Sequence, residues 1–167
     1  ITQYKRLANS TNTLSDDWFT AVSQLIKVYE IEKQHAKANF WRKKAVSTGS
    51  KGLSSLAEFS KKTVLTAASI LAAQEVTAFL ALPIAPPFDK TLPQKQAALA
   101  QALDAYEVLA GFGISPYYEE SLHQLGFLYI EFANALIDSD RPEDLSELAL
   151  EEYEILLEEQ AFDFEEK

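Results

Sequence analysis

The 167-residue chain contains no cysteine and no methionine, and it has only five glycines. Without cysteine there are no disulfides, no thiol catalysis and no thiolate metal ligands, and the compartment stays open between periplasm and cytoplasm. Proline is also scarce, and four of the six prolines fall within residues 83–93. Because the rest of the chain has so few residues that interrupt helices, we expect long helices rather than many short strands.

Catalytic motifs are missing as well. The chain shows no nucleophile–base pair, phosphate-binding loop or zinc signature, so we expect a protein that is not an enzyme and carries no cofactor. It shows no signal peptide. The most apolar stretch, residues 63–82, has Gln74 and Glu75 near its middle, which favours a buried helix over membrane insertion. We expect residues 1–167 to be a single domain that belongs to a larger protein.

Charge is divided unevenly along the chain. Residues 1–62 carry 11 Lys and Arg against 5 Asp and Glu, a net charge of +6. Residues 63–167 carry 4 against 20, a net charge of −16. The total of −10 argues against nucleic-acid binding, which needs clustered positive charge. Because the two halves of the chain carry charge of opposite sign, we expect either a contact with a charged protein partner or salt-sensitive head-to-tail self-association.

Apolar periodicity and capping residues divide the chain into helical segments. Ser15 is the expected N-cap of the first segment, and capping boxes at Thr91 and Asp140 are expected to begin two later ones. Residues 83–91 are expected to form a proline-rich internal loop. The pattern leaves open whether 16–48 and 53–82 are each one helix or two. The expected helical segments are 16–32, 35–47, 53–82, 91–111, 116–137 and 140–160.

Residues 122–129 have the pattern Leu-x2-Leu-Gly-x2-Tyr, and residues 149–153 have Ala-x3-Tyr. These patterns resemble the first and second helices of a tetratricopeptide repeat, and residues 22–29 are a poorer copy. The resemblance implies an all-α fold of antiparallel helix pairs stacked as a solenoid. An irregular helical bundle is the alternative. In the repeat frame Gly126 lets the paired helix approach closely, so a Leu there should overpack the contact by about 1–3 kcal/mol.

The same resemblance implies a non-enzymatic interaction or scaffolding domain that binds a peptide or partner helix on its concave surface. Lys27 and Lys61 would lie one repeat apart in that groove, where they meet a ligand carboxylate. The full set of implied groove positions is Ser23, Lys27 and Glu30, then Ala57, Lys61 and Val64, then His123, Phe127 and Ile130.

Two charged surfaces add candidate partner-binding residues. An acidic ridge occupies one face of the last helix, because its members are spaced by 4, 4, 3 and 4 residues. A solvated helix face is the commoner explanation of such a ridge. A basic stripe surrounds Trp41, which is either an interface anchor or part of the core. The acidic members are Glu143, Glu147, Glu151, Glu154 and Glu158, and the basic stripe comprises Lys33, Lys37, Arg42, Lys43 and Lys44.

Both histidines occur in Glu-x-x-His pairs, Glu32 with His35 and Glu120 with His123. This spacing occurs in the di-metal centres of four-helix bundles, which also need one Glu from each of two further helices. Residues 1–29 contain no Glu. The pattern therefore favours surface histidines with acidic neighbours. A metal- or small-ligand-binding helical bundle is the alternative function.

Overall fold

The computed structural model describes residues 2–9, 14–142 and 145–166. Within these ranges the protein consists of α-helices and one short 3-10 turn, with no strand, which confirms the expected all-α class. The elements are α1 (Thr2–Ala8), α2 (Asp16–Ile31), α3 (His35–Gly49), the 3-10 turn η1 (Leu53–Ser55), α4 (Glu58–Leu80), α5 (Phe88–Gly111), α6 (Tyr117–Ile137) and α7 (Glu147–Glu165).

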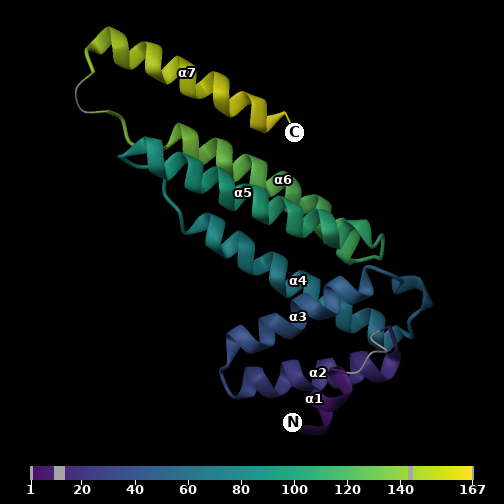
Figure 1. The fold of residues 1–167 in the computed structure, drawn as a ribbon. Helices are drawn as coiled ribbons and strands as arrows, with labels where there is room; N and C mark the ends of the chain where they lie inside the picture. Colours follow the sequence, from purple (N-terminus) through teal and green to yellow (C-terminus); the bar gives the residue numbers. More distant parts are fainter. Residues whose placement is uncertain (1, 10–13, 143–144, 167) are drawn as a thin grey trace.

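Consecutive helices pack side by side, each against the helix before it and the helix after it. In addition, α2 packs directly against α4. Figure 1 shows the result as an elongated stack, with α1 and α2 at one end and α7 at the other. The buried side chains form two clusters, one between α1 and α4 and one from α4 onward, so α4 contributes to both.

The structure separates the segments that the sequence pattern left open. A turn at residues 32–34 divides α2 from α3, and Lys33 adopts the left-handed conformation there with φ of 56°. The Gln34 amide donates to the Tyr29 carbonyl at 2.7 Å and ends α2. Residues 58–80 are one helix. Of the helices in the described ranges, α4 alone is long and apolar enough to cross a membrane, and the part of its apolar surface that is buried belongs to both clusters.

The caps agree with the sequence in one place and differ in two. Ser15 accepts a hydrogen bond from the Trp18 amide at 3.3 Å, as expected for an N-cap. Thr91 does not cap a helix, because α5 already begins at Phe88 and the loop is shorter than 83–91. Instead, the Thr91 hydroxyl donates to the Ala85 carbonyl at 2.6 Å and ties the proline-rich loop to the side of α5.

The last helix begins later than the Asp140 capping box predicts. Ser146 is the N-cap of α7, and its hydroxyl accepts from the Ala149 amide at 3.3 Å. Among the described residues no helix begins at Asp140, and the fourth residue of the expected box, Glu143, lies outside them. Arg141 instead donates to the Ile137 carbonyl at 2.9 Å, so it closes the end of α6. At its other end α7 runs to Glu165 rather than stopping near 160.

The close helix approach lies at Gly49 and not at Gly126. A Cβ atom on Gly126 would have no neighbour within 4 Å, so the expectation that α6 needs a small residue there is wrong. A Cβ atom on Gly49 would lie 2.5 Å from Val64 Cγ2, well inside van der Waals contact. The last turn of α3 therefore approaches α4 at a distance that only glycine permits.

Asp16 in the first turn of α2 binds the start of α4, which lies 41 to 44 residues away in sequence. Its Oδ1 atom accepts from the Ala57 amide at 3.1 Å and from the Ser60 hydroxyl at 2.5 Å. Ser60 is fully buried. The first amides of a helix have no partner within the helix, so a carboxylate supplied by another helix both satisfies α4 and fixes its position against α2.

We expect Asp16→Ala to lower the free energy of unfolding by about 1–2 kcal/mol, since it removes two hydrogen bonds to a charged acceptor. Asp17→Ala is the matched control, because Asp17 is exposed and also sits in the first turn of α2. Both variants lose the same favourable interaction with the helix dipole. Urea titration should show a larger loss of unfolding free energy for Asp16→Ala than for Asp17→Ala. Equal losses would contradict the role of Asp16 as a cap for α4.

Candidate functional site

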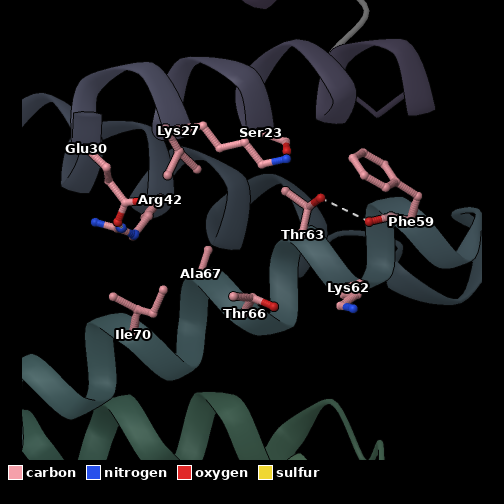
Figure 2. Close-up of a pocket in the computed structure, with 11 residues that line it drawn as sticks. Ser23, Lys27, Glu30, Arg42, Phe59, Lys62, Thr63, Thr66, Ala67 and Ile70 are labelled. Carbon is pink, nitrogen blue, oxygen red and sulfur yellow. Dashed lines mark hydrogen bonds and ion pairs between the residues drawn. The ribbon is translucent and has the colours of Figure 1, made fainter. Parts of the chain in front are cut away.

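A groove with a volume of about 360 Å³ lies between α2 and α4, and α3 closes it from behind. It exists because α2 and α4 pack directly against each other at one end and diverge along their length (Figure 1). Figure 2 shows side chains from both helices pointing into the space between them. The lining consists of Ser23, Ile26, Lys27 and Glu30 from α2, Arg42 from α3, and Phe59, Lys62, Thr63, Thr66, Ala67 and Ile70 from α4.

Part of the groove is apolar. Ile26 and Ala67 are buried at its base, and Ile70 is half-buried beside them. Phe59 stands at the other end with 49% of its surface exposed. An aromatic ring that is half exposed at the edge of a concave surface is available for contact with a ligand side chain.

The rest of the groove is positively charged. Lys27 and Lys62 are exposed, and within the described ranges neither forms an ion pair. They come from α2 and α4, so they lie on opposite walls (Figure 2). Two uncompensated ammonium groups above an apolar base suit a ligand that carries both carboxylates and apolar side chains.

Arg42 is the buried charge of the site, with a side chain only 4% exposed. Its guanidinium pairs with Glu30 across the groove and donates to the Asn39 Oδ1 atom at 2.7 Å. Its Nε atom has no hydrogen-bond partner among the described residues. The pair fixes the closed end of the groove, where α2 and α3 meet. Sequence spacing gives no indication of it, because Glu30 and Arg42 belong to different helices.

Of the groove positions implied by the repeat resemblance, those on α2 line the groove and those on α4 do not. Ser23, Lys27 and Glu30 line the groove. On α4, Lys61 pairs with Glu58 at 2.8 Å and Val64 is buried against Gly49. The face that lines the groove lies about half a turn around the helix, at Phe59, Lys62, Thr63 and Thr66. The cation opposite Lys27 is therefore Lys62 and not Lys61.

The other candidate residues are spread over the molecule. Trp41 is buried in the core, so its interpretation as an exposed anchor is wrong. Lys43 and Lys44 are exposed, and the Lys44 ammonium lies 5.2 Å from the Trp41 ring centre. His123 is exposed and Phe127 half-buried on α6, away from the groove. Of the acidic ridge, Glu147, Glu151, Glu154 and Glu158 are all exposed, and Glu143 lies outside the described residues.

The two Glu-x-x-His pairs do not form a metal centre in the described structure. Among the described residues no group of three or more His, Asp or Glu side chains is placed to hold a metal ion. Glu32 instead accepts a hydrogen bond from Gln34 at 2.8 Å in the turn after α2. His35 and His123 are both exposed, on helices that do not adjoin.

A buried lysine lies at a second hollow, between the end of α4 and helices α5 and α6. The Lys95 ammonium donates to the Phe79 carbonyl at 2.8 Å and lies 4.0 Å from the centre of the Phe79 ring. Burial lowers the pKa of Lys95, and nearby Glu131 partly opposes that shift. Because this ammonium satisfies a carbonyl at the end of α4, its role is to cap that helix.

Comparison with family models, with curated proteins and with solved structures finds no match to this chain. Function has therefore to be inferred from the groove itself.

Proposed function

We propose that the protein is a non-enzymatic interaction domain that binds a peptide or partner helix in the groove between α2 and α4. The observation that carries the proposal is the pair of uncompensated lysines, Lys27 and Lys62, on opposite walls of a partly apolar groove. The ligand class that fits is an acidic segment with at least one large apolar side chain. An apolar side chain packs against Phe59 at one end of the groove or against Ile70 at the other, and the carboxylates beside it meet the two ammonium groups.

The groove and the charge of the chain suit a protein segment as the ligand. A groove of about 360 Å³ has room for one or two apolar side chains of a peptide. The net charge of −10 disfavours nucleic acid. The two core clusters bury part of the apolar surface of α4, which favours packing within the protein over membrane insertion.

The helix arrangement supports a tetratricopeptide-like solenoid as the framework for this function. In such a solenoid the first helices of neighbouring pairs pack together and line the concave surface. Here α2 and α4 pack together and line the groove, while α3 lies behind them. We therefore assign α2 with α3, α4 with α5, and α6 with α7 as helix pairs of one repeat array.

The test is a selection of peptides of about 12 residues on the full chain, followed by affinity measurement by fluorescence anisotropy. We expect the selected peptides to combine Asp or Glu with Leu, Ile or an aromatic residue. Lys62→Glu should weaken their binding about tenfold or more, since it removes one attraction and adds a repulsion. The loss should shrink as salt is raised.

Lys61→Glu is the matched control. It makes the same charge change one residue away, on a face of α4 that does not line the groove. Its affinity should stay within about twofold of the unmodified chain, since Lys61 is paired with Glu58 and does not line the groove. If both variants weaken binding equally, the ligand responds to overall charge and the groove is not its site. Selection of peptides without acidic residues contradicts the proposal directly.

A further inference from the structure

The outer face of α7 carries an apolar stripe. Leu148, Ile155 and Phe162 are 67%, 56% and 54% exposed. They are spaced by seven residues, close to two helical turns, so they form a straight line along the helix. The opposite face of α7 packs on α6 through Leu157 and Ala161. The stripe is therefore turned away from the protein, where a solvated helix would carry polar residues.

Glutamates flank this stripe on both sides. Glu151 and Glu158 lie on one side, and Glu152 and Glu159 lie on the other, by helical geometry. All four are exposed. An apolar line between two acidic rows is typical of a helix that pairs with a helix carrying apolar and basic residues. In coiled coils, the charged positions that flank the apolar seam select the partner in the same way.

The outer face of α3 has the complementary chemistry. Phe40 lies at its centre and is 53% exposed. Lys37, Lys43 and Lys44 surround it and are all exposed. The Lys44 ammonium lies 5.4 Å from the centre of the Phe40 ring, so the aromatic and basic groups form one surface. The opposite face of α3 is buried through Ala38, Trp41 and Ala45.

We propose that the apolar stripe of α7 docks on the basic outer face of α3 in a second copy of the chain. One copy cannot join the two faces, because α3 and α7 belong to opposite ends of the stack and do not touch (Figure 1). The charge division, +6 for residues 1–62 and −16 for residues 63–167, favours the same head-to-tail orientation. Each copy keeps one unused face of each kind, so assembly continues beyond a dimer unless a ring closes.

The first experiment is sedimentation of the full chain at low salt, about 20 mM, and at high salt, about 500 mM, over a range of concentrations. We expect the average mass to rise past that of a dimer at low salt and to fall toward the monomer at high salt, because the flanking charges are screened. A monomer at low salt and high concentration overturns the proposal. An association that salt does not weaken also overturns it.

The second experiment separates head-to-tail pairing from a symmetric dimer. Ile155→Glu disables only the α7 face, and Lys43→Glu or Phe40→Glu disables only the α3 face. Each variant alone should be monomeric. An equimolar mixture of an α7 variant with an α3 variant should form a 1:1 complex that does not grow, since one intact contact remains. A mixture that stays monomeric, or single variants that still assemble, overturns the proposal.

Val108→Glu is the control for these substitutions. Val108 is 47% exposed on α5, so the variant makes the same kind of change on a surface outside both faces. It should assemble like the unmodified chain. If it does not, the loss of assembly in the α3 and α7 variants is caused by net charge and not by the two faces. Circular dichroism of every variant establishes that the helices are intact, and Lys43→Glu serves as the α3 variant if Phe40→Glu unfolds.

Discussion

Replacing Gly49 with Ala is expected to lower the free energy of unfolding by about 1–3 kcal/mol, the range for overpacking a tight contact. The added methyl group would lie 2.5 Å from one methyl of Val64 and 2.7 Å from the other. Val64 is fully buried and β-branched, so its side chain has essentially one rotamer available in a helix and cannot swing aside. The helices α3 and α4 must therefore separate. Chemical denaturation of the variant measures the loss.

Two further variants test the cause. Gly126→Ala makes the same change in the middle of α6, where the new methyl group has no neighbour within 4 Å. We expect it to stabilise the protein by up to about 1 kcal/mol, because alanine favours helix. Val64→Ala in the Gly49→Ala background should cost less than the sum of the two single changes. Additive losses would show that the two residues are not in contact.

Replacing Glu30 with Ala is expected to lower the free energy of unfolding by about 2 kcal/mol. The change leaves the buried Arg42 guanidinium with Asn39 as its remaining hydrogen-bond acceptor among the described residues. Removing one partner of a fully buried ion pair costs about 3–5 kcal/mol. The cost here is smaller because the Glu30 side chain is 46% exposed, so water from the groove reaches the site.

Arg42→Met should cost less than Glu30→Ala, although it removes the other half of the same pair. Methionine has a similar shape and carries no charge that needs a partner, and the half-exposed Glu30 stays solvated. In the double variant, Arg42→Met should recover most of the loss from Glu30→Ala. Urea titration of all four proteins gives the coupling free energy. If Arg42→Met lowers the free energy of unfolding more than Glu30→Ala does, Glu30 does not stabilise the protein by neutralising the buried charge of Arg42.

The fold could be predicted from sequence where a helix carries its own local information. The start of α2 at Ser15 and the extent of α6 follow from capping and apolar spacing. The starts of α5 and α7 could not be predicted as well, because Thr91 and Asp140 resemble N-caps but α5 begins at Phe88 and α7 at Glu147. The tertiary cap by Asp16 is likewise invisible to any local rule.

The candidate site could be predicted on one wall only. α2 has a clear apolar face, and the residues next to it, Ser23 and Lys27, line the groove. α4 contacts α2, α3 and α5 and is apolar around most of its circumference, so its sequence does not show which face is turned toward α2. A shift by one 34-residue period, the tetratricopeptide repeat length, therefore selected Lys61 instead of Lys62.

The position of α4 in both hydrophobic clusters has a consequence for how the protein responds to a ligand. The side of α4 that carries Val64 and Ala67 belongs to one cluster, and the side that carries Leu65 and Phe79 belongs to the other. Neither cluster is complete without this helix, so the two ends of the stack cannot unfold independently of it. A peptide held against Lys62 would therefore slow the opening of α5, a helix that contributes nothing to the groove.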